Sequence, residues 1–462
     1  LYFGGIFMKT RMNFKDEFYQ KLKLLVLPIA IQNFMLALVS ATDAIMLGWI
    51  DQTSLSAVSL AGQVQFVLSL FISGIAAGAG IMAAQYWGKQ DAASIEKVIP
   101  IALRTNLLFS GLFTILAGFC PEMLMRIFTN DAALVASGSQ YLRAVALSYV
   151  LCGISQVYLI LLKNTGHAAV SSRISSTAVV LNIILNAILI YGLCGAPALG
   201  IRGAAYATVA ARVVELIWAY LETKKPERVR ILWNRLFSSA GKILSEDFWR
   251  YTLPVLAASL VWGIAYVLYS VIMGHMGSDA VAANSITSIA KSLLSCLIRG
   301  VSGGAGVLIG NLLGANELEK AREYGRRLSH LSIAIGIVTG GLLMLISPAI
   351  VHFAPLSDTA AEYLQYMLLF CGLNLMAQSV NTTVLDGIFC AGGDAKFDMQ
   401  GNIGAMWCFS VPLGFLAAFW LKLPVMVVYC IVNLDEIVKL PAVYHHYKKY
   451  IWVRNITRDV ED

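Results

Sequence analysis

The segment GIAAGAGIMAAQYWG, residues 74–88, recurs in related form as GVSGGAGVLIGNLLG, residues 300–314. Glycine falls on glycine at four positions without a gap: Gly74 with Gly300, Gly78 with Gly304, Gly80 with Gly306, and Gly88 with Gly314. The same shift pairs Leu27-Pro28 with Leu253-Pro254, Gly48 with Gly274 and Gln85 with Asn311, and a shift longer by one position pairs Gly166 with Gly393. The chain is therefore predicted to consist of two repeated halves.

The solvent around these halves follows from the composition. Of the 462 residues only 13% are charged and 58% are apolar, whereas soluble domains carry about 25% charged and about 45–50% apolar residues. Such a chain has too little charge to cover a water-exposed surface, so a lipid bilayer is expected to surround most of it. The net charge of +7 comes from short basic clusters between apolar runs. A nucleic-acid-binding protein needs a contiguous basic face instead.

A transmembrane helix needs about 20 mostly apolar residues. Suitable stretches cover residues 22–48, 55–86, 97–120, 138–162, 172–192, 201–221, 251–274, 281–312, 328–353, 362–385, 399–420 and 424–444. We therefore expect an all-α integral membrane protein with twelve transmembrane helices in two parallel six-helix lobes around a central cavity. The predicted parts are a tag or leader (1–14), an N-lobe (15–221), a cytoplasmic linker (222–247), a C-lobe (248–446) and a cytoplasmic tail (447–462).

The orientation follows from basic residues, which collect in cytoplasmic loops. Lys21 and Lys23 lie at the start of the first predicted span, Arg326 and Arg327 follow the eighth, and the loops at 49–54 and 275–280 contain no Lys or Arg. Both termini are therefore expected in the cytoplasm, and the chain is expected to be a monomer in the inner membrane of a prokaryote. Two halves with an even number of spans have the same orientation, and transporters place the substrate site at such a repeat interface.

Enzyme chemistry finds little support in the motifs. The run Gly78–Ala83 is similar to a dinucleotide fingerprint, but it lies inside an apolar helix rather than between a strand and a helix. Small residues in such helices allow close backbone approach. The sequence contains no G-x-x-x-x-G-K-[ST] loop, no H-E-x-x-H and no C-x-x-C among its eight cysteines. No catalytic residue, cofactor or certain metal site is expected.

Polar residues inside the predicted spans are the candidates for function. Asp43 lies deep in the first span, where a charged carboxylate costs roughly 2.5–3.5 kcal/mol on insertion scales. The fifth span supplies Asn182 and Asn186, which are spaced i and i+4 and so lie on one face, and the sixth supplies Thr208. These groups could form a hydrogen-bond network around a proton, and Asp43 and Asn182 could ligate Na⁺. Alternatively, the amides and the hydroxyl only join helices.

Further residues are candidates for the wall of a substrate cavity. They are Gln32, Asn33, Trp262, Tyr266, Tyr269 and Gln378. The three aromatic residues form a stripe that either packs in the core or binds an organic cation by cation–π contact. Arg212 and Glu215 are expected to form a local ion pair, and Asp435, Glu436 and Lys439 to close the last helix. Lys291 and Arg299 share one helix face and could line a cavity or anchor Asp386.

The chain resembles the multidrug and toxic compound extrusion (MATE) transporters over nearly its whole length. The resemblance lies in Thr42-Asp43-Ala-Ile-Met-Leu-Gly48, Ala83-Ala-Gln85-Tyr-Trp-Gly88 and Leu199-Gly-Ile-Arg-Gly-Ala-Ala-Tyr-Ala-Thr208 of the first half. In the second half it lies in Ile309-Gly-Asn311-Leu-Leu-Gly314-Ala-Asn316 and Cys390-Ala-Gly-Gly-Asp394. Each motif alone is weak evidence, and together they are strong evidence.

This resemblance implies export of organic, often cationic or amphipathic compounds by antiport with H⁺ or Na⁺. It assigns the family's aspartate of the first helix to Asp43. Family members often carry an acidic residue one helical turn after the first Asn, and this chain has Asn186 there. Some members carry another acidic residue in a later helix, where this chain has Ser379 or Asn381. Both departures weaken the expectation that this chain has the Na⁺ sites of other family members. A flippase for lipid or polysaccharide precursors is the alternative; its anionic substrate would want a strongly basic cavity.

Overall fold

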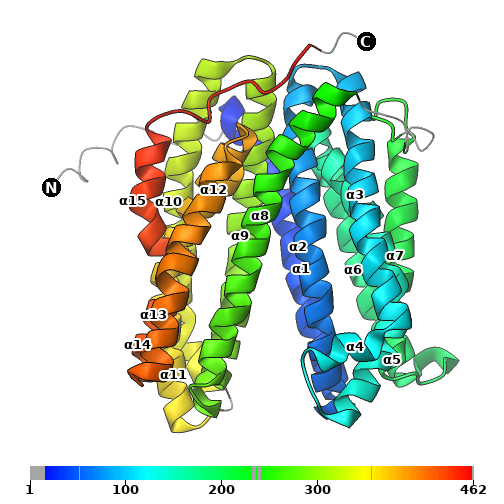
Figure 1. The fold of residues 1–462 in the computed structure, drawn as a ribbon, viewed down its shortest axis with the longest axis vertical. Coiled ribbons are helices and arrows are strands. Elements are labelled where there is room, and N and C mark those ends of the chain that lie inside the picture. Colours follow the sequence, from blue (N-terminus) through cyan, green and yellow to red (C-terminus); the bar gives the residue numbers. More distant parts are fainter. Residues whose placement is uncertain (1–15, 51, 232–235, 237–240, 355, 460–462) are drawn as a thin grey trace.

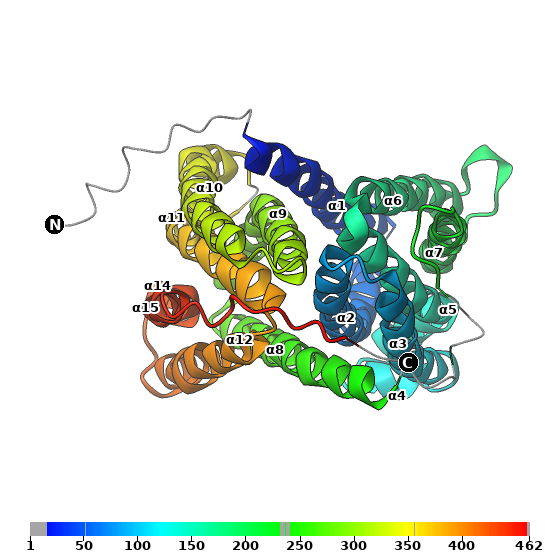
Figure 2. The same ribbon diagram turned by 90° about the horizontal axis from the view of Figure 1, so that it is seen from above.

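The computed structural model describes residues 16–50, 52–231, 236, 241–354 and 356–459. The predicted leader, residues 1–14, lies outside this range. Throughout the described part all regular structure is helical, and the helices form two lobes that lie side by side (Figures 1 and 2).

The N-lobe begins with α1 (Glu17–Gly48), which bears Asp16 as its N-cap. The remaining N-lobe helices are α2 (Gln52–Gly88), α3 (Ala92–Phe119), the short α4 (Pro121–Arg126), α5 (Ala132–Leu162), η1 (Lys163–His167), α6 (Ala168–Tyr191), η2 (Leu193–Gly195) and α7 (Ile201–Thr223).

The C-lobe repeats this order with more irregular helices. It consists of α8 (Lys242–Gly274), α9 (Ser278–Gly314), α10 (Leu318–Phe353), α11 (Asp358–Thr382), η4 (Thr383–Phe389), α12 (Ala395–Asn402), η5 (Ile403–Ser410), α13 (Val411–Phe415), η6 (Leu416–Trp420), α14 (Val425–Val432) and α15 (Asp435–Tyr447). Because α7 continues to Thr223 and α8 begins at Lys242, helix occupies both ends of the segment predicted as a linker, residues 222–247.

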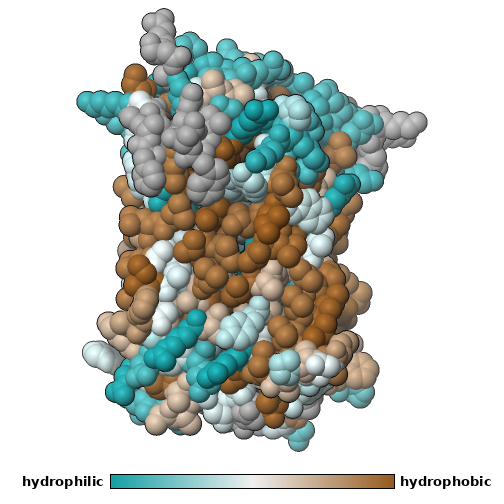
Figure 3. Space-filling model, turned by 90° about the vertical axis from the view of Figure 1, so that its right-hand side faces the viewer, coloured by the Kyte–Doolittle hydropathy of each residue, from teal (hydrophilic) through white to brown (hydrophobic). Residues whose placement is uncertain are grey.

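The predicted twelve crossings are consistent with this architecture. Ten described helical stretches are long and apolar enough to cross a bilayer, and the longest, Ala132–Tyr191, bends at Gly166 into α5 and α6. The shorter α14 and α15 follow each other along one further crossing (Figure 1). An apolar belt lies between two polar ends on the face shown in Figure 3.

Among the described residues, the two lobes share hydrophobic cores at one end of the molecule. At the end where α1 and α8 begin, here called the terminal end, Phe18 and Leu22 of α1 belong to the C-lobe core. Reciprocally, Leu244 and Phe248 of α8 belong to the N-lobe core. The cores toward the opposite end each contain residues of one lobe only, and the lobes diverge there in Figure 1.

The repeated glycines form this contact between the lobes. Gly78 of α2 packs on Thr252 of α8, where an added Cβ would lie 2.7 Å from the Thr252 Cα atom. Its counterpart Gly304 of α9 packs on Val26 of α1, where an added Cβ would lie 2.8 Å from a Val26 methyl carbon. Glycine at these positions is required because only a residue without a Cβ lets the helices approach so closely.

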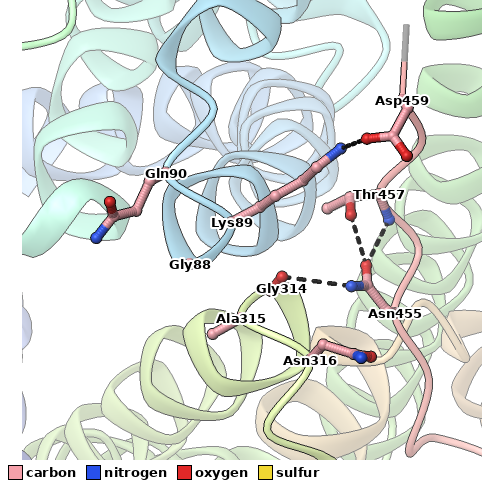
Figure 4. A pocket seen from close by; sticks show the side chains of 9 residues that line it. All are labelled: Gly88, Lys89, Gln90, Gly314, Ala315, Asn316, Asn455, Thr457 and Asp459. Carbon is pink, nitrogen blue, oxygen red and sulfur yellow. Dashed lines mark hydrogen bonds and ion pairs between the residues drawn. The ribbon is translucent and has the colours of Figure 1, made fainter.

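The helix ends of the two repeats also match. Gly88 contacts the backbone of Asn311, and Gly314 contacts the backbone of Gln85. Shortly after each glycine, Gln90 (φ 63°) and Asn316 (φ 62°) adopt the same left-handed conformation. These residues lie on the two sides of a pocket at the terminal end (Figure 4).

Residues 448–459, here called the C-terminal strap, cross from one lobe to the other at this end (Figure 2). Trp452 is fully buried in the C-lobe core, and Arg454 donates to the carbonyl oxygens of Gly392 and Gly393 at 2.7 and 2.6 Å. Ile456 belongs to the N-lobe core, and its backbone N–H donates to Gln85 Oε1 at 2.9 Å. The predicted tail thus packs against both lobes.

Candidate functional site

Asp43 and the three polar residues predicted around it lie in one hydrogen-bonded chain inside the N-lobe. Asn186 Nδ2 donates to Asp43 Oδ1 at 2.6 Å and to Asn182 Oδ1 at 3.3 Å. Asn182 Nδ2 donates to Thr208 Oγ1 at 3.3 Å, and Thr208 Oγ1 donates to the Ala204 carbonyl oxygen at 3.0 Å. At its other end the network reaches the Asp43 carboxyl group, which accepts from Asn186.

Three helices position this network. Asp43 comes from α1, the two amides come from one face of α6, and the hydroxyl comes from α7. Asn182 and Asn186 are buried, and the carbonyl oxygen Oδ1 of Asn186 has no hydrogen-bond partner. Within the described residues Asp43 forms no ion pair. A carboxyl group with neutral neighbours and an unused buried acceptor beside it can hold a proton or contribute to a cation site.

The residues predicted to line a substrate cavity are distributed over several places. On α1, Asn33 donates to the Ile29 carbonyl oxygen of its own helix at 2.9 Å, and Gln32 is half-buried. On α8, Trp262 and Tyr266 are stacked with ring centroids 5.6 Å apart. Tyr266 also approaches Phe66 of α2, so this aromatic pair reaches the other lobe.

The remaining two predicted cavity residues pack within the C-lobe. Tyr269 packs beside two small C-lobe cores, and Trp262 packs beside one of them as well. Gln378 accepts a hydrogen bond of 3.5 Å from Ser295.

The C-lobe holds a buried charged cluster that the sequence analysis interpreted only as the closure of a helix. Lys439 Nζ lies 3.2 Å from Glu436 Oε1, 3.6 Å from Asp435 Oδ2 and 3.2 Å from Asn402 Oδ1. The amide of Asn402 in turn donates to Asp398 at 3.2 Å. All of these residues are buried.

An internal comparison could have found this cluster in the sequence. The predicted ion pair of the N-lobe is confirmed, since Arg212 Nη1 lies 2.9 Å from Glu215 Oε1, and Ser155 donates to the same carboxylate at 2.6 Å. The shift that pairs Gly166 with Gly393 also places Arg212 on Lys439. The repeat therefore predicts a second basic residue inside the C-lobe.

A metal centre of the usual kind does not occur in the described residues. No group of three or more His, Cys, Asp or Glu side chains there is arranged to hold a metal ion. The eight cysteines are free thiols.

The fold is that of a polytopic membrane protein built from two lobes. A sequence model of the MatE family matches residues 28–188 and again residues 254–416. The starts of the two matches, Pro28 and Pro254, are equivalent positions in the glycine register. The chain belongs to the MatE family, the multidrug and toxic compound extrusion transporters.

Several curated proteins are similar over most of their length. The "Uncharacterized transporter YisQ" of Bacillus subtilis is 21% identical, covering 92% of this chain and 93% of that protein. The "Probable multidrug resistance protein YoeA" of the same organism is 21% identical over 98% of both chains. The "Probable multidrug resistance protein NorM" of Thermotoga maritima is 24% identical, covering 88% of this chain and 87% of that protein.

Solved structures show the same fold at lower identity. A MOP superfamily transporter from Pyrococcus furiosus aligns with a TM-score of 0.84 at 19% identity, covering 94% of this chain and 95% of that chain. A multidrug resistance MATE transporter in an outward-facing conformation aligns with a TM-score of 0.80 at 19% identity, covering 93% and 95%.

Proposed function

We propose that this transporter exports organic, often cationic or amphipathic compounds by antiport with H⁺ or Na⁺, with Asp43 as the group that binds the coupling ion. The observation that carries the proposal is the Asp43–Asn186 pair at 2.6 Å, a carboxyl group inside a lobe that only neutral donors stabilise. The names of the curated relatives, which include multidrug resistance proteins, support the class of substrate.

The chemistry of exchange follows from the hydrogen-bonding capacity of the site. An ionised Asp43 accepts the Asn186 N–H and attracts a cation, whereas a protonated Asp43 has an O–H to donate. The partnerless Asn186 Oδ1 is an acceptor within the same side chain. A coupling ion shifts the equilibrium between two conformations only as far as its affinity for them differs. Proton and cation therefore alternate at one carboxyl group.

The arrangement of the lobes supports alternating access. The lobes share cores and the C-terminal strap at the terminal end, while each has a separate core toward the opposite end. We propose that the terminal end faces the cytoplasm of a prokaryotic cell, so that this structure is open to the outside. The aromatic pair Trp262 and Tyr266 is suited to contact an organic cation between the lobes.

The experiment is dye efflux from proteoliposomes under one imposed gradient at a time, a pH gradient or a Na⁺ gradient. Wild-type protein should export the dye with one of them. Asp43→Asn should insert into the bilayer normally, but its dye efflux should equal the background of empty liposomes. The amide has neither an acidic proton to exchange nor a negative charge to bind a cation.

An exposed carboxylate provides the matched control. Glu319→Gln makes the same change from carboxylate to amide, but at an exposed residue that pairs with Arg322. This variant should keep gradient-driven efflux. Full efflux by Asp43→Asn, or dye movement that needs no gradient, would refute the proposal.

A further inference from the structure

The buried cluster of the C-lobe has the geometry of an occupied cation site. The Lys439 ammonium is surrounded by oxygen atoms of Glu436 and Asn402 at 3.2 Å and of Asp435 at 3.6 Å. The ammonium group stands where a free monovalent cation would be coordinated, and its stem anchors it to α15.

The charges around this ammonium are unbalanced. Lys439 contacts two buried carboxyl groups, from Asp435 and Glu436, and the Asn402 amide that it also contacts donates to a third, Asp398. Asp386 of η4 is exposed. Like charges held together at low dielectric repel strongly unless a cation or protons compensate them.

The other basic residues nearby do not occupy the centre of the cluster. Lys291 of α9 binds the Asn374 side-chain carbonyl oxygen at 3.0 Å and is half-buried, and Arg299 of α9 is exposed. Within the described part of the chain neither forms an ion pair with the cluster. Lys439 is therefore the cation that the carboxyl groups contact.

Two features of the backbone and the amides favour ion binding at this point. The last crossing is interrupted between α14 and α15, so Asp435 and Glu436 lie in the first turn of a new helix, where negative charge is favourable. Asn381 is buried and donates to Glu436 Oε2 at 2.8 Å, while its own Oδ1 has no partner. Interrupted helices and a spare buried oxygen are typical of ion sites in transporters.

The repeat relates this cluster to the coupling network of the N-lobe. The shift that pairs Gly166 with Gly393 places Thr208 on Asp435, and Arg212 on Lys439. The C-lobe thus has a carboxyl group where the N-lobe network ends in a hydroxyl.

We propose that the Lys439 ammonium occupies the cation position of a second acidic site in the C-lobe and thereby excludes free monovalent cations from it. Only the consequence for transport rests on the proposed antiport function. This consequence is that a cation that drives the transport cycle binds in the N-lobe, at Asp43. Lys439 then determines which lobe responds to the coupling ion.

The test measures thermal unfolding of purified protein in detergent, with choline chloride replaced by KCl, NaCl or NH₄Cl at constant ionic strength. The wild-type midpoint should show no salt dependence that comes from this cluster, so any response to a salt should disappear in Asp43→Asn. Lys439→Met removes the ammonium and keeps the apolar stem, so a small cation should raise its midpoint by about 2 °C or more, whereas the bulky choline ion should not.

Two further variants are matched to this one. Lys439→Arg keeps the internal cation and should respond to the four salts as the wild type does. Lys291→Met removes an ammonium that binds an amide rather than a carboxylate, and it should also respond as the wild type does. A purely structural ion pair would instead make Lys439→Met less stable to the same extent in all four salts.

Three outcomes would overturn the proposal. The first is a folded Lys439→Met variant whose midpoint is the same in every salt. The second is a wild-type protein that KCl or NaCl stabilises and that loses this response in Glu436→Gln but keeps it in Asp43→Asn. If Lys439→Met does not fold, NH₄Cl or KCl during extraction should restore the yield of folded protein. The third outcome is that neither salt restores this yield although Lys439→Arg folds. None of these measurements uses transport, so they are independent of the export assay.

Discussion

In the N-lobe, the half-buried Arg212 pairs with a single buried carboxylate, Glu215, whereas Lys439 at the equivalent position of the C-lobe contacts two carboxylates and an amide. Among the described residues, Asp43 of the N-lobe forms no ion pair, and Asn186 is the side chain that donates a hydrogen bond to it. The basic residue of each lobe thus stabilises a different arrangement: a closed pair in one lobe and an acid-rich cluster in the other.

This difference separates what the repeat preserves from what it does not. The glycines at the contact between the lobes match one for one because both copies of the helix pair must approach equally closely. The buried charges differ because each lobe needs only local compensation of its own carboxyl groups. A transporter built from two similar lobes can therefore confine ion exchange to one of them.

The largest expected effect on stability comes from breaking the closed pair of the N-lobe. Glu215→Gln removes a fully buried carboxylate and leaves the half-buried Arg212 without its anion, so it should lower the free energy of unfolding by about 3–5 kcal/mol. Glu319→Gln removes the partner of Arg322 in an exposed pair and should change it by less than about 1 kcal/mol. Thermal or denaturant unfolding in detergent measures both. If both variants changed the free energy of unfolding equally, the Arg212–Glu215 pair would contribute no more to stability than an exposed ion pair.

The C-terminal strap allows the two lobes to be compared through one segment. Trp452→Ala removes a fully buried indole from the C-lobe core and should cost about 3–5 kcal/mol. Ile456→Ala removes a smaller side chain from the N-lobe core and should cost less. Unfolding midpoints of the two variants and of the exposed variant Tyr444→Ala provide the comparison. A cost for Trp452→Ala no greater than that for Tyr444→Ala would mean that the strap is not anchored in the C-lobe.

The glycine contacts predict an asymmetry within the repeat. Gly78→Ala places its methyl group against the Thr252 backbone and should cost about 1–3 kcal/mol, because backbone cannot move aside. Gly304→Ala meets the end of the Val26 side chain and should cost less. Gly62→Ala lies in the same helix as Gly78 with open space around it, and should be neutral or stabilising. The order of the three unfolding midpoints is the measurement, and any other order contradicts the packing described.

The smallest expected effect concerns an ion pair between the lobes at the terminal end. The Arg327 guanidinium on α10 donates to Asp16, the N-cap of α1, and holds the pKa of this carboxyl below its ordinary value. A lowered pKa in the folded state stabilises the protein above the unfolded pKa of about 4, and this contribution disappears as the pH falls through the folded pKa. Asp16→Asn retains an N-capping side chain, so it isolates the charge. Its midpoint should lie slightly below the wild type at pH 7 and approach it as the pH falls below about 3, and a constant difference would exclude the ionised carboxyl as the cause.

Much of the candidate site could be predicted from the sequence because helix periodicity relates residues on one face. Asn182 and Asn186 share a face of α6 at the i and i+4 spacing, and both contact the network as expected. The same reasoning grouped Tyr269 with Trp262 and Tyr266. Trp262 and Tyr269 pack beside one small C-lobe core, and Trp262 stacks on Tyr266.

The fold class, the parallel repeat and the isolated carboxyl of Asp43 were determined by the sequence itself, because composition, register and the cost of charge in lipid are local or periodic properties. Only the tertiary structure decided which oxygens surround Lys439 and that Trp452 and Ile456 connect the two lobes. These contacts join segments far apart in the chain, and no spacing along one helix encodes how the helices pack against each other.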